Sequence, residues 1–204
     1  MNLFLYDQIP ANKTAFANKV VEISKLLGIN PDWLMLVMYF ESKLNSKAKN
    51  PGSSATGLIQ FLEATAKELG TTTAKLAAMT NVQQLDFVYR YLVRYQSKLK
   101  SVQDVYLAVF YPAAMGKDLT YIFPFSPRTV ELNKIFDQDG NKQISVGEIR
   151  NLIVKYGNEL ANKFNYKPSA VEADFKKYIP TIKNTGSALM IAAVFFLAYK
   201  ILKK

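Results

Sequence analysis

Glu41 is the residue best suited to chemistry in this sequence, because a carboxylic acid falls there on the apolar side of a predicted helix. Within residues 31–42, Leu34, Val37, Met38 and Glu41 recur at the spacing that puts side chains on one helical face. Desolvation and the negative end of the helix macrodipole both raise the pKa of a carboxyl group. We therefore expect a proton donor near neutral pH, as the cleavage of a glycosidic bond requires. A surface Glu at a frayed helix end is the alternative interpretation.

The elements that must position this acid are helical. Asn30 is suited to cap a helix and Pro31 to occupy its first position, where no backbone donor is needed. The same 3.6-residue rhythm predicts further helices, and Gly28 and Gly70 mark the ends of two of them. A loop at residues 50–54 could carry a short hairpin. The fold class is therefore predicted to be all-α, with helices at residues 14–27, 31–42, 63–69, 81–98 and 101–113.

Four aromatic side chains lie on the predicted helices and could stack on sugar rings. They are Trp33, Tyr89, Tyr91 and Tyr95. Aromatic residues at helical spacing belong more often to a core, so the pattern favours packing over binding.

The residues around and after Glu41 resemble the catalytic core of lytic transglycosylases with the goose-type lysozyme fold. In that family an E-S pair ends a helix, a G-L-[MI]-Q segment lines the cleft, and a T-A pair opens the next helix. The resemblance implies that Glu41 is the sole acid and base and that Ser42 positions substrate or water. It also implies that the cleft segment binds substrate, with Gln60 contacting the sugar. The matching residues are Glu41, Ser42, Asn45, Ala48, Ala55, Gly57, Leu58, Ile59, Gln60, Phe61, Thr65 and Ala66.

By this resemblance the substrate is peptidoglycan, cut at the bond between N-acetylmuramic acid and N-acetylglucosamine. One carboxyl group suffices if the N-acetyl group of the substrate replaces the second carboxylate of ordinary glycosidases. A transglycosylase then closes the sugar on its own hydroxyl and leaves a 1,6-anhydro end, whereas a hydrolytic muramidase admits water. Both outcomes stay open from the sequence, as does a catalytically inactive structural protein of a virion membrane.

A third family segment, usually A-Y-N-A-G, is altered in residues 107–114. Phe110 stands where the family has a tyrosine, and Tyr111 follows it. Tyr111 is therefore the substrate-binding candidate here, and the change at Phe110 is the feature that favours the inactive alternative. Phage-type relatives with a similar F-x-P-A-A pattern argue for retained activity.

Composition narrows the chemistry and the partners. The chain of 204 residues has no Cys and no His, which excludes disulfides, the usual thiol or serine-histidine nucleophiles, and common zinc sites. A net charge of +10 indicates an anionic partner, such as a wall polymer or lipid headgroups. The basic residues form no arginine-rich run or nucleic-acid motif, so we expect no nucleic-acid partner.

Residues 137–148 resemble the calcium-binding loop of an EF-hand. Calcium takes six to eight oxygen ligands, and that loop supplies them from fixed positions. Lys142 departs from the pattern, because position 6 normally holds Gly with positive φ. Bound Ca²⁺ would be structural, and a degenerate loop that kept only its turn is the alternative. The predicted ligands are Asp137, Asp139, Asn141, the Gln143 carbonyl and Glu148.

The last part of the sequence has the composition of a membrane anchor. Residues 184–199 contain no charge, and Lys residues flank the apolar run on both sides. A buried terminal helix is the alternative, but such a helix normally shows a polar face. The first ten residues lack the pattern of a cleavable secretory signal. We therefore expect a single-pass C-terminal anchor, in a virion membrane of a bacteriophage or in the bacterial envelope, acting in infection or lysis.

These features predict four parts in order along the chain. They are a lysozyme-like domain at residues 1–127, an EF-hand-like helix-loop-helix packed on it at 128–166, a helical linker at 167–183, and the anchor at 184–204.

Overall fold

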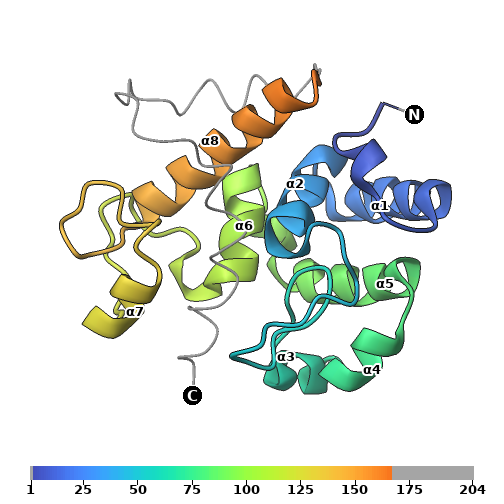
Figure 1. Ribbon diagram of the computed structural model, residues 1–204, viewed down its shortest axis with the longest axis horizontal. Helices are drawn as coiled ribbons and strands as arrows, with labels where there is room; N and C mark the ends of the chain where they lie inside the picture. The colour runs from blue at the N-terminus through green and yellow to red at the C-terminus, as the bar shows by residue number, and fades with distance from the viewer. Residues whose placement is uncertain (1, 167–204) are drawn as a thin grey trace.

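The computed structural model describes residues 2–166, and these residues fold almost entirely into helices (Figure 1). Extended pairing in this part of the chain is limited to the isolated bridges Lys49 to Thr56, Thr56 to Phe61 and Ile122 to Ser145. The α-helices are α1 (Lys13–Leu27), α2 (Pro31–Ser42), α3 (Glu63–Glu68), α4 (Thr73–Ala78), α5 (Asn81–Leu92), α6 (Val102–Phe110), α7 (Pro127–Leu132) and α8 (Val146–Lys163). The 3-10 turns are η1 (Tyr6–Gln8), η2 (Val93–Lys98) and η3 (Pro112–Ala114).

The all-α prediction is thus confirmed for the described residues. Across residues 2–166, no helix combines the length and the apolar character needed to cross a bilayer. The predicted linker at 167–183 and anchor at 184–204 lie outside the residues that the structure describes.

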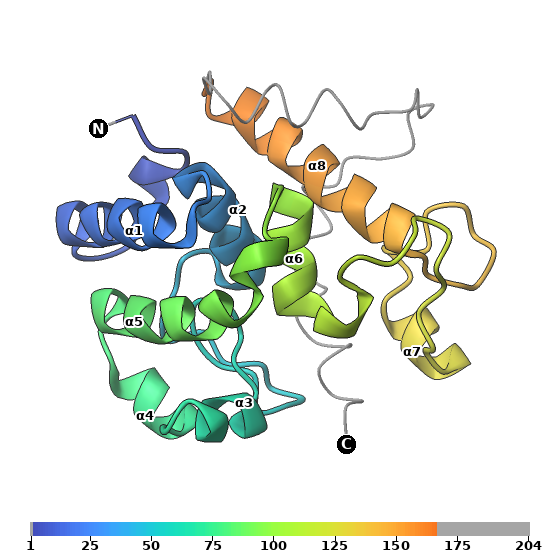
Figure 2. The same cartoon turned by 180° about the vertical axis from the view of Figure 1, so that it is seen from behind.

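Helix α6 lies at the centre of the molecule. Figures 1 and 2 show it in the middle, with α2 and α5 on one side and α8 crossing on the other. All of its residues except Asp104 are buried. A helix that is apolar nearly all round is stable only inside a core, which explains why the other helices pack around α6.

Helix α2 begins and ends where the sequence predicts. The Asn30 side chain accepts a hydrogen bond from the Asp32 backbone nitrogen at 2.9 Å, and Pro31 opens the helix. The Asp32 carboxylate in turn accepts hydrogen bonds from the Phe4 nitrogen (2.8 Å) and the Tyr166 hydroxyl (3.1 Å). The start of α2 therefore holds both the N-terminal segment and the residues after α8.

Two predicted helices end earlier than expected, and one helix was not predicted. The helix expected at 81–98 is α5 followed by the tighter turns of η2, and the helix expected at 101–113 ends at Phe110 because Pro112 disfavours a helical conformation in the residue before it. Helix α4 was not predicted, although the Thr72 side chain caps it by accepting a hydrogen bond from Lys75.

The helix-loop-helix predicted at 128–166 contains two helices of unequal length. Helix α7 ends at Leu132, whereas α8 continues to Lys163. Helix α8 packs on α6, where the Arg150 guanidinium lies 3.0 Å from the Asp104 carboxylate. The segment after the loop also pairs with the preceding chain, since the Val146 nitrogen donates to the Tyr121 carbonyl at 2.9 Å.

Candidate active site

Glu41 lies in the last turn of α2 and is only 8% exposed. Its neighbours along the same face, Leu34, Val37 and Met38, are fully buried. The carboxyl group therefore sits in the desolvated environment that the spacing predicts.

Ser42 joins the end of α2 to the segment that follows it in the family pattern. Its hydroxyl oxygen lies 2.9 Å from the Met38 carbonyl oxygen and 2.9 Å from the Leu58 carbonyl oxygen. The first contact lies within the helix, and the second crosses to the loop. Ser42 thus fixes the loop beside the helix end that carries Glu41.

Gly57 and Leu58 are structural parts of this loop. Gly57 has φ +82°, and a Cβ there would lie 3.0 Å from the Gln84 side-chain amide carbon and still closer to its oxygen. That oxygen accepts a hydrogen bond from the Leu58 nitrogen at 3.0 Å. The Gln84 amide nitrogen donates to the Ser46 and Leu76 carbonyls, both at 2.6 Å. A buried amide therefore holds the loop from behind, and only glycine fits against it.

Gln60, predicted to contact the sugar, also bonds within its own loop. Its side-chain nitrogen donates to the Gly57 carbonyl at 2.9 Å and the Ala48 carbonyl at 3.2 Å. Its backbone has φ +52°, an uncommon value for a non-glycine residue. The turn is closed by reciprocal hydrogen bonds between Thr56 and Phe61 at 3.0 and 2.9 Å. The segment is therefore a tight, internally bonded turn.

A pocket of about 180 Å³ opens beside this turn. The predicted residues Ile59, Gln60 and Phe61 line it, whereas Ser42, Gly57 and Leu58 are not among its lining residues. The remaining lining residues come from α3, α5, η2 and the end of α6. They are Leu62, Thr65, Glu68, Tyr91, Arg94, Tyr95, Val109, Phe110 and Pro112.

Tyr91 and Tyr95 were assigned to the core from the sequence, but both line the pocket. Their rings lie 5.6 Å apart, and the Tyr91 ring meets Phe61 edge to face at 6.2 Å. Burial raises the pKa of the Tyr91 phenol above its ordinary value, and Glu41 contributes in the same direction. The phenol therefore stays protonated and donates to the Ala108 carbonyl at 2.7 Å. Glu41 itself does not occur among the described residues that line this pocket.

Phe110 and Tyr111 differ in their relation to the pocket. Phe110, which stands where the family has a tyrosine, lines the pocket and stacks on Tyr106 at 5.6 Å. Tyr111, the predicted substrate contact, packs against Phe123 at 5.2 Å and Phe125 at 5.8 Å. Tyr111 does not occur among the described residues that line the pocket.

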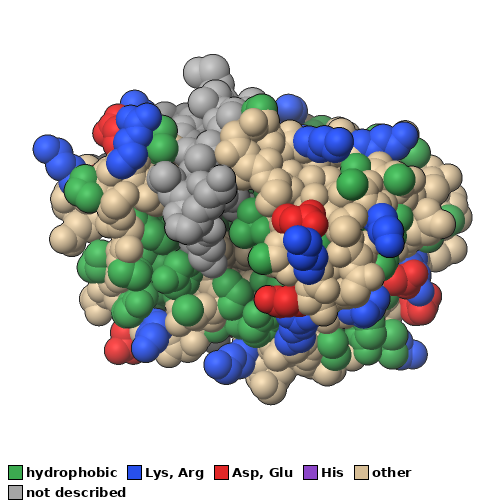
Figure 3. All heavy atoms as spheres, turned by 90° about the horizontal axis from the view of Figure 1, so that it is seen from below, with side chains coloured by type: hydrophobic (Ala, Val, Ile, Leu, Met, Phe, Trp, Pro, Cys, Tyr) green, Lys and Arg blue, Asp and Glu red, His purple; other side chains and the backbone are tan. Residues whose placement is uncertain are grey.

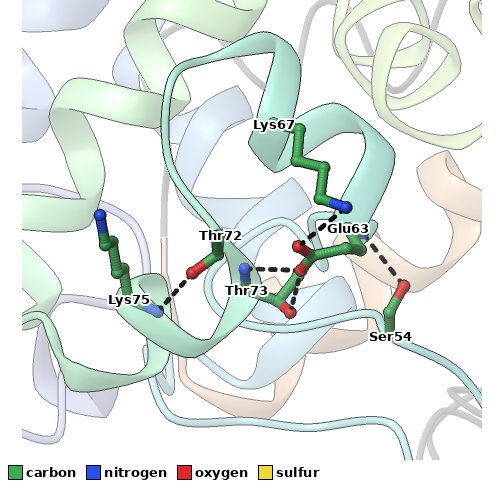
Figure 4. Close-up of polar contacts among 6 residues, drawn as sticks. All are labelled: Ser54, Glu63, Lys67, Thr72, Thr73 and Lys75. Carbon is green, nitrogen blue, oxygen red and sulfur yellow. Dashed lines mark hydrogen bonds and ion pairs between the residues drawn. The ribbon is translucent and has the colours of Figure 1, made fainter.

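Helix α3, which supplies one side of the pocket, is fixed by Glu63 (Figure 4). The Glu63 carboxylate accepts hydrogen bonds from the Thr73 hydroxyl (2.6 Å) and nitrogen (2.9 Å), while its own nitrogen donates to Ser54 at 3.0 Å. The hydrogen bonds from Thr73 hold the pKa of Glu63 below its usual value, and Lys67 adds to the effect. Glu63 thus joins α3 to α4 through its carboxylate and to the loop at Ser54 through its backbone nitrogen.

Lys43 is the cation next to Glu41 in the chain. The residue as a whole is exposed, but its ammonium lies over the Tyr39 ring at 4.7 Å and the Tyr156 ring at 5.2 Å. It donates to the Tyr156 hydroxyl at 2.6 Å. This enclosure lowers the pKa of Lys43 to about 8, although the charge of Glu41 opposes the shift.

The acidic loop lies at a different place, between α7 and α8. Carboxylate oxygens of Asp137, Asp139 and Glu148 lie within 4.8 Å of one another. One Asp137 oxygen accepts from the Lys142 nitrogen at 3.0 Å, and the other is buried without a hydrogen-bond partner among the described residues. Lys142 adopts φ +64°, so the backbone keeps the turn despite the missing glycine.

Other predicted ligands accept hydrogen bonds that form the turns of this loop. The Asn141 side-chain oxygen accepts from the Gln143 nitrogen at 2.8 Å, and both residues are exposed. Glu148 accepts from the Gln138 and Ser145 nitrogens, each at 2.8 Å, and forms a capping box with Ser145. Each carboxylate oxygen can accept more than one contact, so this set of hard oxygens fits Ca²⁺.

Comparison with known proteins bears on the first of these two sites. Residues 20–111, just under half of the chain, match the family model described as Transglycosylase SLT domain. The matched range runs from within α1 to the residue after α6 and includes Glu41, the 56–61 loop and Tyr91. No curated protein and no solved structure matches the chain.

Residues 20–111 are therefore similar to transglycosylase SLT domains, which belong to the lysozyme-like superfamily. Domains of this family are lytic transglycosylases, so the match supports an enzyme that cleaves glycosidic bonds and takes peptidoglycan as its substrate.

Proposed function

We propose that the protein is a lytic transglycosylase that cleaves the bond between N-acetylmuramic acid and N-acetylglucosamine, with Glu41 as its single acid and base. The observation that carries this proposal is the burial of Glu41 at the end of α2, where Ser42 ties the helix to the loop that lines the pocket. Burial favours the protonated form that a leaving oxygen requires.

The acidic residue that lines the pocket is poorly suited to that role. Among the described lining residues, Glu68 is the one carboxylate, and its side chain is 62% exposed. It is also paired with Arg94 at 2.9 Å. A general acid needs an apolar environment, and Glu68 lies in an exposed and charged one. We therefore assign the role of general acid to Glu41.

The reaction proceeds in two proton transfers. Glu41 donates its proton to the leaving glycosidic oxygen, while the N-acetyl group of the muramic acid stabilises or attacks the anomeric carbon. The Glu41 carboxylate then accepts the proton of the sugar's own 6-hydroxyl, whose oxygen closes the 1,6-anhydro ring. If water takes the place of that hydroxyl, the same residues perform hydrolysis, which is the alternative function.

Digestion of purified sacculi by the full chain tests the proposal. We expect soluble muropeptides with 1,6-anhydromuramic ends, identified by mass spectrometry. Reducing ends would instead establish a hydrolytic muramidase. Binding of sacculi without release of fragments would favour the inactive structural protein, for which the Phe110 substitution is the specific argument.

We propose further that the 137–148 loop binds Ca²⁺ as a structural ion. The fit of three converging carboxylates, one of them with a buried oxygen that lacks a hydrogen bond among the described residues, supports this proposal. Bound Ca²⁺ would supply a charge that holds the loop between α7 and α8. Calorimetric titration of the chelator-treated protein with CaCl₂ tests it, and the absence of heat above dilution would contradict it.

We also propose that residues 184–204 anchor the enzyme in a membrane, either of a virion or of the bacterial envelope. The uncharged run from 184 to 199, flanked by Lys residues, supports this proposal. The full chain should float with phosphatidylglycerol vesicles in a density gradient at high salt. A variant carrying both Val194→Asp and Leu197→Asp should stay at the bottom, and equal flotation of the two proteins would contradict the anchor.

A further inference from the structure

Two charged side chains lie on the wall of the pocket, and they are paired with each other. Glu68 comes from α3 and Arg94 from η2, with 2.9 Å between the guanidinium and the carboxylate. The other described lining residues are apolar, aromatic or neutral. Both partners are accessible, since the Arg94 side chain is 35% exposed and that of Glu68 62%. An ion pair in contact with water stabilises little, so a competing anion can replace one partner.

The surface around this pair carries charges of both signs. Figure 3 shows acidic and basic side chains interspersed on the α3 and α4 side of the face seen from below, and hydrophobic side chains gathered on the α7 side. A second pair, Glu63 with Lys67 at 3.9 Å, belongs to the same helix as Glu68. The charges on this side are therefore mixed rather than uniformly basic. Arg94 is set apart because it lines the pocket.

Arg94 lies on the same wall of the pocket as Tyr91. Tyr91 precedes Arg94 by three residues, so both point to the same side of the chain. Another wall is formed by the loop that Ser42 ties to the end of α2. The pocket thus combines the loop next to the end of α2 with a wall that carries a guanidinium. Such a pocket suits a sugar that carries a negative charge away from the bond to be broken.

We propose that Arg94 binds a carboxylate carried by the muramic acid of the substrate and exchanges Glu68 for it. The inference rests on the proposed function and names the chemical group of the substrate that the same pocket selects. A guanidinium can hold a carboxylate through two parallel hydrogen bonds, which neutral hydroxyl groups cannot match. Glu68 holds the guanidinium in place before substrate binds and competes with the substrate afterwards.

The carboxylate has two chemical sources. The lactyl group of N-acetylmuramic acid ends in a free carboxylate when no peptide is attached. When a peptide is attached, that group is an amide, and the carboxylates belong to the peptide. Chito-oligosaccharides have the same sugar backbone and neither source.

Calorimetric titration of the full chain carrying Glu41→Gln tests the inference without turnover. Three ligands are compared: the disaccharide of N-acetylglucosamine and N-acetylmuramic acid, the same disaccharide bearing L-alanyl-D-glutamate, and N,N′-diacetylchitobiose. Arg94→Gln should weaken binding of a carboxylate-bearing ligand about tenfold and leave chitobiose unchanged. The ligand that responds identifies the source of the carboxylate.

Glu68→Gln is the decisive second variant, because we expect it to change the affinity for the carboxylate-bearing ligand in the opposite direction. Removal of the competing carboxylate should tighten binding of the same ligand several-fold, and Arg94→Lys should recover part of the affinity that Arg94→Gln loses. If the ion pair only joins α3 to η2, then Arg94→Gln and Glu68→Gln will either weaken the binding of all three ligands equally or change the binding of none. That result overturns the inference.

The outcomes are separable from those of the proposed function. Sacculi that are cut by the wild-type chain while the variants show no carboxylate dependence would leave the function standing and reject the role of Arg94. Carboxylate-dependent binding with uncut sacculi would reject the catalytic function and retain the subsite.

Discussion

The loop beside Glu41 and the acidic loop before α8 are both tight turns, but their polar groups are used differently. In the 56–61 loop, backbone groups are held by side chains from distant elements, such as Gln84 and Ser42. In the 137–148 loop, the carboxylates bond to backbone nitrogens of the same loop, as Asp137 does with Lys142. The first loop is therefore held by distant elements as well as by its own hydrogen bonds, whereas the second depends on local turns and, in the proposed calcium-bound form, on the ion.

This difference bears directly on catalysis. A site that orients a sugar against one acid must be rigid before the substrate arrives, because misplacement of the reacting groups is costly. The Ser42 contact and the Gln84 amide provide that rigidity around Glu41. The acidic loop needs no such precision if its ion is structural.

The largest effect should come from breaking the first loop at its tightest point. Gly57→Ala places a methyl group against the Gln84 side chain, which cannot move without losing its hydrogen bonds to Ser46 and Leu76. We expect the free energy of unfolding to fall by about 3 kcal/mol in urea denaturation. Gly116→Ala is the matched control, because Gly116 has a similar φ of +79° with open space around its Cβ position. It should lose only about 1 kcal/mol, from backbone strain.

If the two alanine variants are destabilised equally, then the cost is one of backbone conformation alone. The buried amide would not then be what holds the loop.

The acidic loop should respond to its ion instead. Calcium at about a hundred times its dissociation constant should add about 2.7 kcal/mol to the free energy of unfolding, since the ion binds the folded state. Asp139→Asn should remove most of this gain, and Lys142→Gly should increase affinity because glycine accepts φ +64° without strain. The measurement is the melting temperature with CaCl₂ and with a chelator.

Asp118→Asn is the control for the loss of an exposed acidic residue outside the loop. A melting temperature that is the same with calcium and with chelator in the wild-type chain would show that the turns alone support this region.

A smaller effect is expected from Ser42→Ala. The substitution removes the hydroxyl that contacts the Leu58 carbonyl, and we expect a loss of about 1 kcal/mol in stability together with slower release of fragments from sacculi. Ser24→Ala is the control, since Ser24 is also buried in a helix but its hydroxyl has no hydrogen-bond partner among the described residues. Removing that hydroxyl should be neutral or stabilising. An equal loss of stability in both variants would show that the contact of Ser42 with the Leu58 carbonyl does not stabilise the loop.

The smallest effect is a pH dependence at Lys43. The folded state lowers the pKa of this group from 10.5 to about 8, so between these values the unfolded chain binds the proton that the folded chain has released. Stability should therefore rise with pH across that window. As the pH increases from about 7 to 10, the melting temperature of the wild type should rise relative to that of the Lys43→Met variant. A difference between the two proteins that does not change with pH would show that the ammonium is fully solvated.

The sequence predicted the helix that carries Glu41 to the residue, and the physical reason is local. Asn30, Pro31 and the apolar spacing act within one helix, and Gly28 ends the preceding one with φ +71°. Helix α4 escaped prediction because its six residues are too few to show a periodic pattern, whereas the equally short α3 is followed by Gly70, which marks a helix end.

The pocket was predicted only in part, because its walls come from distant parts of the chain. Glu68 and Arg94 are 26 residues apart, and no pattern in the sequence joins them. Tyr91 and Tyr95 have the spacing of core residues, and whether such rings face a core or a pocket depends on what packs opposite them. Tyr111 shows the converse, since the ring predicted to meet substrate lies against Phe123 instead.

The central claim is that one buried carboxyl group performs the cleavage, and the rate of fragment release from sacculi by Glu41→Gln tests it most directly. Glu22→Gln, on the exposed face of α1, serves as the control for loss of a carboxylate. We expect Glu41→Gln to retain the fold and lose about a thousandfold in rate, while Glu22→Gln keeps the wild-type rate. A folded Glu41→Gln protein that releases fragments as fast as the wild type would contradict the claim.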